Sequence, residues 1–377
     1  MINDKRLVDE FIELVKIDSV SKHEGKLTKV LKAKLEQIGA KVFLDDAGKK
    51  IGSDGGNLIA KIEGDTSLPT IMLNAHLDTV VPGEGIKPII KEGIIKSDGT
   101  TILGSDDKSG IAIILEILRV LKEGKIKHPP IDVVLTICEE VGLLGAKNLD
   151  FSLIDAQMGY SLDTEEIDRL VTRAPSHNTF TIKVYGKASH AGASPEKGIS
   201  AIAVASKAIA KLTLGKIDDE TTANIGIIQG GQATNIVTPF VEVKGEVRSH
   251  NERKLEYETQ EIMKTFWKTA RKMKKIIDGK LVFPRTEEKI TKEYNCYFLA
   301  EDVQVVKRAL EAGQKLGLEM QTVKTGGGSD ANIFNEKGIK TAVLGTSMSK
   351  VHTKEEFIKI SDLILGAKLL LEIVTAK

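Results

Sequence analysis

Two histidines and several carboxylates follow short apolar runs along this chain. His76 closes the run IMLNAH, and Asp78 comes two residues later. In an extended backbone the side chains of residues i and i+2 point the same way, so a carboxylate can orient the imidazole beside it. Imidazole nitrogens together with carboxylate oxygens suit zinc, and a carboxylate can bridge two ions. His76 and Asp78 are therefore candidates for a metal site.

Further acidic and imidazole groups share this placement at the ends of predicted strands or at a loop-to-helix junction. They are Asp106 and Asp107 in GSDDKSG (104–110), Glu139 and Glu140 after IDVVLTIC, Asp163 in QMGYSLD, and His352. Two histidines with three or four carboxylates are enough for two adjacent zinc ions that share one carboxylate, as in aminopeptidases and other hydrolases. A remaining carboxylate could act as general base on a bridging water.

Each of these motifs also has a purely structural explanation. His76 and Asp78 could cap a strand end, and the Asp pair could be a helix N-cap favoured by the helix dipole. The Glu pair could be a solvated turn. The chemical interpretation depends on all five motifs reaching the same edge of one sheet, because catalytic residues in α/β sheets gather at the carboxyl ends of strands.

The elements that would position these residues alternate between strand and helix. We expect helices over 4–17, 25–38 and 108–121, and strands over 41–44, 57–62, 71–76, 131–138 and 157–163. After residue 292 the pattern resumes with a helix over 302–316, strands over 319–323 and 341–345, and a helix over 361–375. This order predicts an α/β domain with a mixed, largely parallel sheet flanked by helices.

The middle of the chain has a different order. Strands are expected over 179–186, 221–229, 240–249 and 276–283, with helices over 199–212 and 252–272. This is the β-α-β-β-α-β order of a ferredoxin-like domain. We therefore expect one domain from 1–175 and 293–377, and a second domain, 176–292, inserted into it. The hinges between them are expected near 174–177 and 286–292.

Composition limits the classes of partner. The 377 residues include 54 Lys and Arg against 53 Asp and Glu, a net charge of +1. This balance lacks the basic excess of a dedicated nucleic-acid binder and gives no reason to expect a membrane partner. The longest apolar run, 110–118, is too short to span a bilayer. Cys138 and Cys296 are too few for a disulfide framework, so we expect a cytoplasmic setting.

Six segments in one order resemble the peptidase T branch of the co-catalytic dizinc metallopeptidases. That family also includes the carboxypeptidase G type, acetylornithine deacetylase, succinyl-diaminopimelate desuccinylase and aminoacylases. The segments are NAHLDTVVPGEG (74–85), GSDDKSGIA (104–112), TICEEVGLLGA (136–146), YSLDTEE (160–166), KASHAGASPEKGISAI (187–202) and KVHTKEEF (350–357). The resemblance implies a zinc-exopeptidase-like catalytic domain with an inserted lid or dimerisation domain.

The resemblance also implies a role for each site residue. It assigns His76 and Asp163 to the first zinc ion, Glu140 and His352 to the second, and Asp106 to the bridge between them. Glu139 resembles the general base and Asp78 the carboxylate that orients His76. The implied cofactor is two zinc ions per subunit, although cobalt or manganese could fill such sites. In the family the peptide bond after the bridging aspartate is cis.

Residues of the inserted domain resemble the family's substrate-binding positions. His190 resembles a lid histidine that stabilises the oxyanion, in dimeric members from the neighbouring subunit. Asn235 and Arg248 match positions that hold a substrate carboxylate or carbonyl, and Gly327 and Gly328 lie in a substrate-side loop, GGGSD (326–330). These positions also have purely structural alternatives. His190 could lie in a surface loop, Arg248 on an exposed strand, and GGGSD in a turn that enters a helix. The resemblance further implies a homodimer formed through the inserted domain.

The implied activity is hydrolysis of a peptide bond in a small peptide by a metal-bridged water, most like a tripeptide aminopeptidase. Deacylation of an N-acyl amino acid, or carboxypeptidase action, uses the same chemistry, and no residue decides between the substrate ends. A non-catalytic peptide- or metal-binding module is a third alternative. It would be expected to lack Glu139 or a metal ligand, and the sequence retains them all.

Overall fold

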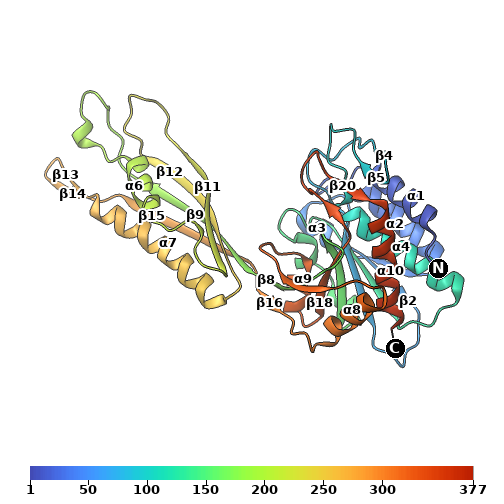
Figure 1. Cartoon of the computed structure of the whole chain (residues 1–377). Helices are drawn as coiled ribbons and strands as arrows, with labels where there is room; N and C mark the ends of the chain where they lie inside the picture. The colour runs from blue at the N-terminus through green and yellow to red at the C-terminus, as the bar shows by residue number, and fades with distance from the viewer. Residues whose placement is uncertain (377) are drawn as a thin grey trace. The chain divides into compact units, whose positions relative to one another are not determined.

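The computed structural model describes residues 1–376, which form two compact units (Figure 1). Unit 1 comprises Met1–Arg173, Phe298–Thr325 and the chain from Ser329 onward, and unit 2 comprises Ala174–Tyr297 and Gly326–Gly328. The sequence placed the second crossing at 292/293, with a hinge over 286–292. The two units divide instead at 297/298, and the segment 286–292 lies within strand β15 (Arg285–Tyr294), whose register with β9 shifts between Lys292 and Tyr294.

Unit 1 is built on a nine-stranded sheet, which confirms the predicted mixed α/β class. Its order is β1-β2-β6-β3-β7-β18-β8-β16, with β17 beside β8. The strands are β1 (Lys41–Leu44), β2 (Leu58–Ile62), β3 (Ile71–His76), β6 (Ile131–Thr136), β7 (Met158–Thr164), β8 (Arg169–Ala174), β16 (Tyr297–Phe298), β17 (Gln321–Lys324) and β18 (Lys340–Gly345). The central strand β3 pairs in parallel with β6 and β7, and β7 pairs in parallel with β18.

Helices flank this sheet (Figure 1). They are α1 (Asp4–Val15), α2 (Gly25–Ile38), α3 (Ala47–Ile51), α4 (Ser105–Gly124), α5 (Leu144–Lys147), α8 (Gln304–Lys315), α9 (Asp330–Glu336) and α10 (Ile360–Thr375), with a 3₁₀ turn at Phe151–Leu153. Helix α4 packs against β3 and β7 and also contacts α1 and α10, so most of its length is buried. None of the described helices combines the length and apolarity needed to cross a bilayer.

A small second sheet in unit 1 was absent from the prediction, because its strands are only two or three residues long. It contains β4 (Ile89–Lys91), β5 (Ile94–Lys96), β19 (Met348–Ser349) and β20 (Phe357–Lys359), in the order β19-β20-β5-β4. The pairing of β20 with β5 fixes the 350–356 loop to the segment that leads into α4.

Unit 2 has a five-stranded antiparallel sheet in the order β10-β11-β12-β9-β15. Its elements are β9 (Ser176–Tyr185), a 3₁₀ turn (Pro195–Lys197), α6 (Ala201–Ile209), β10 (Gly215–Lys216), β11 (Thr221–Gly230), β12 (Phe240–Ser249), α7 (Glu252–Lys272) and β15. Ile182 and Val243 of the sheet and Phe266 of α7 are fully buried in one core cluster. The ferredoxin-like order is therefore present.

The closing strand of unit 2 differs from the prediction. Residues 276–283 were expected to be one sheet strand, but they contribute to a separate hairpin of β13 (Lys275–Ile277) and β14 (Lys280–Val282). Asp278 and Gly279 have φ angles of 48° and 74°, which reverse the chain in the middle of the expected strand. The fourth long strand of the sheet is β15, which pairs with β9.

Candidate metal centre

The predicted metal ligands converge in unit 1. Strands β6, β3 and β7 are neighbours in the sheet, so the residues at their carboxyl ends meet. Those ends supply Glu139 and Glu140 after β6, His76 at the end of β3, and Asp163 in β7. The start of α4 adds Asp106 and Asp107, and the loop between β19 and β20 adds His352.

Asp106 is at the centre of this cluster. Its Oδ1 lies 2.9 Å from His76 Nε2, and its Oδ2 lies 3.1 Å from His352 Nε2. His352 Nε2 is also 2.9 Å from Glu140 Oε1. The two oxygens of one carboxylate thus face two different imidazoles, an arrangement that suits a carboxylate bridging two ions. The Asp106–Asp107 peptide bond is cis, as the resemblance implied.

Two overlapping sets of side chains, which share His76, each bring three candidate ligand atoms close together. The candidate donor atoms of His76, Asp106 and Glu140 all lie within 4.8 Å of one another, and so do those of His76, Asp107 and Asp163. Asp163 Oδ1 is 3.9 Å from His76 Nε2. Both sets are at least partly buried, and both are made of the nitrogen and oxygen donors that zinc accepts.

Asp78 contacts His76 in a way that differs from the simple prediction. The Nδ1 of His76 lies 2.9 Å from the main-chain carbonyl oxygen of Asp78 and 3.5 Å from its carboxylate. The carboxylate itself accepts the backbone N–H groups of Glu139 at 2.8 Å and Glu140 at 3.2 Å, and the Ser21 hydroxyl at 2.7 Å. A proton on Nδ1, inferred from the carbonyl contact, leaves Nε2 free for a metal ion.

The negative charge of the cluster would favour a bound cation. Burial raises the pKa of Asp107, Glu139 and Asp163 well above the ordinary carboxyl range. Burial would also raise the pKa of Asp106, but hydrogen bonds from His352 and His76 lower it. Negative charge crowded into a buried site is costly unless it is protonated or paired with cations. Six carboxylates around two imidazoles therefore leave a charge that divalent ions would neutralise.

The pKa values of the two imidazoles reflect the same excess of negative charge. Burial alone would lower the pKa of His76, yet hydrogen bonds with Asp106 and Asp78 raise it well above its ordinary value. Hydrogen bonds with Asp106 and Glu140 raise the pKa of His352 to about 10. In the absence of metal, protons on these rings take the place that a cation would occupy between nitrogen and carboxylate.

The sequence did not identify Glu356 as a site residue. Its buried carboxylate accepts four consecutive backbone N–H groups, from Leu103 at 2.7 Å, Gly104 at 2.9 Å, Ser105 at 2.7 Å and Asp106 at 3.2 Å. Glu356 therefore ties the loop that carries His352 to the turn that carries Asp106. The only signal in the sequence was an acidic residue four positions after His352 in KVHTKEEF.

Asp330 is a second buried carboxylate that the sequence did not single out. It is the last residue of the segment GGGSD (326–330), begins α9, and accepts a hydrogen bond from the Thr136 hydroxyl. Burial raises its pKa to about 6. Its negative charge also contributes to the raised pKa of Glu139 and Asp163, so it belongs to the electrostatics of the metal centre.

The expected substrate-binding residues lie in unit 2. His190 is exposed, and its Nδ1 accepts the backbone N–H groups of Gly192 and Ala193, both at 3.1 Å. The carbonyl of Asn235 accepts the N–H of Ala191 at 2.8 Å, so Asn235 and His190 lie on adjacent segments.

Arg248 belongs to a second group in unit 2. Its guanidinium contacts Glu246, Nε to Oε1, at 3.0 Å and the Tyr294 hydroxyl at 3.1 Å. The same tyrosine packs against Gly328, where a Cβ atom would lie 2.3 Å from the ring. A Cβ at Gly327 would meet nothing within 4 Å. Of the two predicted loop glycines, Gly328 is thus required by packing.

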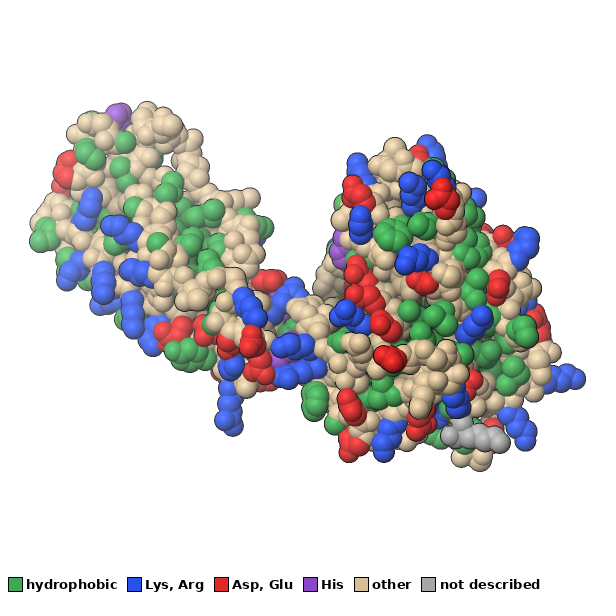
Figure 2. All heavy atoms as spheres, viewed as in Figure 1, with side chains coloured by type: hydrophobic (Ala, Val, Ile, Leu, Met, Phe, Trp, Pro, Cys, Tyr) green, Lys and Arg blue, Asp and Glu red, His purple; other side chains and the backbone are tan. Residues whose placement is uncertain are grey.

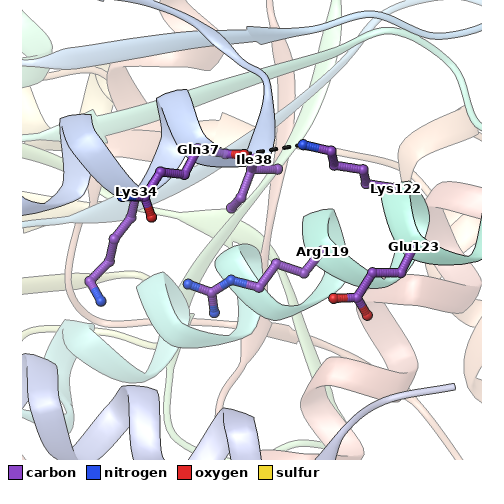
Figure 3. A pocket seen from close by; sticks show the side chains of 6 residues that line it. All are labelled: Lys34, Gln37, Ile38, Arg119, Lys122 and Glu123. Carbon is purple, nitrogen blue, oxygen red and sulfur yellow. Dashed lines mark hydrogen bonds between the residues drawn. The ribbon is translucent and has the colours of Figure 1, made fainter.

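Two other features carry no chemistry. A recess between α2 and α4 is lined by Lys34, Gln37, Ile38, Arg119, Lys122 and Glu123 (Figure 3). Lys34 and Arg119 are paired with Glu10, and Lys122 donates to the Gln37 carbonyl, so these groups join helices. Cys138 is fully buried, and burial raises the pKa of its thiol, which does not suit a nucleophile.

Comparison with known proteins agrees with this geometry. Residues 72–376 match the model of peptidase family M20/M25/M40. The chain is 43% identical to the uncharacterised protein YqjE of Bacillus subtilis, over 99% of both chains. It is 24% identical to peptidase T of Clostridium perfringens over 98% of both chains.

Solved structures show the same relationship. A tripeptidase from Staphylococcus aureus superimposes with a TM-score of 0.94 at 40% identity, covering 100% of this chain and 98% of the other. The aminopeptidase PepT from Bacillus cereus superimposes with a TM-score of 0.91 at 42% identity, covering 99% and 98%. The sequence match, the fold and the convergent ligand cluster lead to one conclusion: the chain is an enzyme of peptidase family M20/M25/M40.

Proposed function

We propose that this enzyme is a zinc-dependent tripeptide aminopeptidase of the peptidase T type. The observation that most supports a two-metal mechanism is the position of Asp106, whose two carboxylate oxygens each face a different imidazole. The choice of substrate class draws on the Staphylococcus aureus tripeptidase and the Bacillus cereus aminopeptidase, which are 40% and 42% identical to this chain.

The proposed cofactor is two zinc ions per subunit. His76 and Asp163 would hold one ion, Glu140 and His352 the other, and Asp106 both. When bound, such a pair lowers the pKa of a water molecule and polarises the scissile carbonyl. Cobalt or manganese accept the same ligands, so metal reconstitution followed by assay decides which ion serves.

Glu139 is the proposed general base. It would take the proton of the attacking water and pass it to the leaving amine. In the metal-free protein burial raises the pKa of Glu139 well above the ordinary carboxyl range, and bound cations would lower it again. The hydrogen bond from the Glu139 backbone to Asp78 holds this residue at the edge of the metal cluster.

Substrate contacts are assigned to His190, Asn235, Arg248, Gly327 and Gly328. In this proposal His190 donates a hydrogen bond to the developing oxyanion, and Arg248 and Asn235 bind the carboxylate or carbonyl of the peptide. The Arg248 guanidinium already pairs with Glu246 at 3.0 Å, so a substrate carboxylate would have to compete with that partner.

We also propose that the enzyme is a homodimer formed through unit 2. Strand β11 is at the edge of the sheet and pairs on its outer side only with the two-residue β10. No charged residue occurs from 221 to 235, and Ile227 and Ile228 are about half exposed. Uncharged edge strands readily pair with another chain. Light scattering tests this, and Ile228→Lys should convert a dimer to a monomer.

The decisive assay compares a tripeptide that has a free amino terminus with its N-acetylated form, using zinc-loaded enzyme. Release of the first residue from the free peptide alone supports the aminopeptidase. Release of acetate or of the last residue from the blocked peptide would instead make the enzyme an N-acyl amino acid deacylase or a carboxypeptidase. The assignment of the metal ligands is independent of this result.

A second experiment separates an enzyme from a binding module. Glu139→Gln should retain both metal ions, measured by elemental analysis, while turnover falls by about 10²- to 10⁴-fold. Full activity in this variant would remove Glu139 from the role of base. Absence of turnover in the wild-type enzyme with every metal and peptide tried would favour a non-catalytic peptide-binding module.

A further inference from the structure

The near-neutral total charge conceals an uneven distribution between the two units. Unit 2 carries 20 Lys and Arg against 14 Asp and Glu. Eight of those 20 cations fall within 264–285, a segment whose single acidic residue is Asp278. This segment forms the C-terminal end of α7, the hairpin β13–β14 and the first residue of β15. Such a concentration of positive charge favours the binding of an anionic partner.

Large apolar side chains are exposed in the same segment. The exposed fractions are 50% for Trp267, 75% for Ile276, 53% for Leu281 and 39% for Phe283. Ile276 and Leu281 are directly opposite each other in the hairpin. The Arg271 guanidinium lies 5.2 Å from the Trp267 ring and 5.1 Å from the Phe283 ring, so it links helix to hairpin. We call these five residues the hairpin patch.

The geometry of the hairpin explains why the patch faces outward. Successive side chains of a strand point to opposite faces. Ile277 is buried in the core of unit 2 and anchors one face of the hairpin, so Ile276 and Leu281 are on the other face. The hairpin is outside the five-stranded sheet, at one end of unit 2 (Figure 1). Nothing in the described part of unit 2 covers these two side chains.

Cations surround the hairpin patch. Exposed lysines flank it on α7 and on both hairpin strands, and Figure 2 shows Lys and Arg side chains along this edge of unit 2. In the described part of the chain, no carboxylate lies within salt-bridge distance of Lys268, Lys272, Lys274 or Lys280. Lys264, by contrast, is paired with Glu261 at 2.6 Å. Four cations are therefore available to an external anion.

We propose that the hairpin patch binds an anionic phospholipid surface. Amphipathic surfaces of this kind bury aromatic and aliphatic side chains at the boundary between headgroups and acyl chains, while lysines contact the headgroup phosphates. Trp267 has the amphipathic ring that favours this boundary. Ile276 and Leu281, among the most exposed apolar side chains of the patch, would enter the acyl region.

Other anionic partners fit the patch less well. A nucleic acid would supply phosphates for the lysines, but Ile276 and Leu281 can neither stack on bases nor donate hydrogen bonds to them. A second copy of this chain would bring another basic segment to a basic segment, which is repulsive. The binding proposed here is independent of peptide hydrolysis, because none of these residues belongs to the metal centre or to the expected substrate contacts.

The chain contains its own reporter, because Trp267 is its only tryptophan. The full-length protein is mixed with vesicles of phosphatidylcholine alone, or of phosphatidylcholine with phosphatidylglycerol, and Trp267 emission is recorded. We expect a blue shift, protection from acrylamide and co-sedimentation only with phosphatidylglycerol vesicles, weakening as salt is added. Equal binding to both vesicle types, or none to either, overturns the proposal.

Two variants and one matched control sharpen the test. Lys274→Glu/Lys280→Glu should lower vesicle affinity by about tenfold or more, and Ile276→Ser/Leu281→Ser should abolish the blue shift. Lys26→Glu/Lys29→Glu makes the same change of charge on exposed positions of α2 and should bind like wild type. All variants should hydrolyse peptide normally.

Three results would contradict the proposal. The first is a control variant that loses vesicle binding as strongly as Lys274→Glu/Lys280→Glu, since net charge alone would then explain binding. The second is a Trp267 blue shift that follows protein concentration without vesicles, which would identify a second copy as the partner. The third is a shift produced by an oligonucleotide but not by phosphatidylglycerol vesicles, which would identify a nucleic acid.

Discussion

The carboxylate of Asp78 accepts the backbone N–H of Glu139 at 2.8 Å. A residue expected only to orient the His76 imidazole thus also positions the proposed general base. Its other oxygen accepts the backbone N–H of Glu140 at 3.2 Å, so one buried side chain fixes the segment that carries both glutamates. The imidazole of His76 is oriented chiefly by the Asp78 carbonyl, which no substitution of the side chain removes.

Asp78→Ala should therefore impair catalysis and also weaken zinc binding, because the segment that Asp78 fixes carries the proposed base Glu139 and the proposed zinc ligand Glu140. With the carboxylate gone, two backbone N–H groups lose their acceptor and Glu139 is no longer held in place. We expect kcat to fall by about 10- to 100-fold with a smaller change in KM. Steady-state kinetics beside zinc titration measures both. Ser21→Ala, which removes only the hydroxyl donated to Asp78, should have a much weaker effect.

Glu356→Gln should weaken metal binding without touching a ligand. An amide cannot accept all four backbone N–H groups from 103–106, and its own NH₂ group opposes them. The turn that holds Asp106 should loosen, and zinc affinity should fall by about 10- to 100-fold. Competition with a chromogenic chelator measures this. Glu355→Gln, at the exposed neighbouring position, is the control, and equal affinity in both variants would contradict the assignment.

Bound metal ions should stabilise the folded protein more strongly as pH rises. Raised carboxyl pKa values at Asp107, Glu139 and Asp163 mean that the folded metal-free protein holds protons that the unfolded chain releases above a pH of about 4. The stability contributed by these groups is complete at low pH and is lost as pH rises through the folded values. The raised pKa of His76 acts in the same direction. Metal ions replace the protons and remove this loss.

The measurement is the rise in melting temperature on adding zinc, compared between mildly acidic and mildly alkaline buffer. We expect the larger rise in the alkaline buffer, together with proton release on binding. Lys108 acts in the opposite sense, because burial lowers its pKa to about 7, but the raised pKa values of His352, about 10, and Asp330, about 6, add to the effect of the four groups above. A zinc-induced rise that is independent of pH would show that the ligands are already ionised in the metal-free protein.

Gly328→Ala should disturb Arg248. The new Cβ would lie 2.3 Å from the Tyr294 ring, which must move, and the Tyr294 hydroxyl is 3.1 Å from the Arg248 guanidinium. If Arg248 binds substrate, KM should rise about tenfold with little change in zinc affinity. Gly326→Ala is the matched control, because a Cβ there meets nothing within 4 Å. Wild-type kinetics in Gly328→Ala would remove this group from substrate binding.

Long amphipathic elements were the most predictable part of the fold. Helix α7 was predicted over 252–272 and spans Glu252–Lys272, because its buried positions recur with helical spacing. The short strands β4, β5, β19 and β20 were not predicted, since two or three residues carry no periodicity. The hairpin β13–β14 was predicted as one sheet strand because apolar residues lie on both sides of Asp278 and Gly279, and the turn that these two residues form was not recognised.

Only those residues of the candidate site that belong to a local sequence pattern could be predicted. Ligand types at strand ends, such as His76 and Glu140, follow from chain order and from the rule that strand ends meet. The role of Glu356 does not, because its partners at 103–106 are about 250 positions away and are backbone groups. Asp330 was equally hidden, since its contact with Thr136 depends on how α9 packs beside the sheet.

The discontinuous course of unit 1 has a consequence for biosynthesis. Strand β18 pairs with β7 on one side and with β8 on the other, and it ends at Gly345. The central sheet therefore remains open at β7 until more than nine tenths of the chain has left the ribosome. Unit 2 has all its long strands by Tyr294. During translation the inserted unit can complete its sheet first, while the unit that holds the proposed metal ligands waits for β18 and for His352.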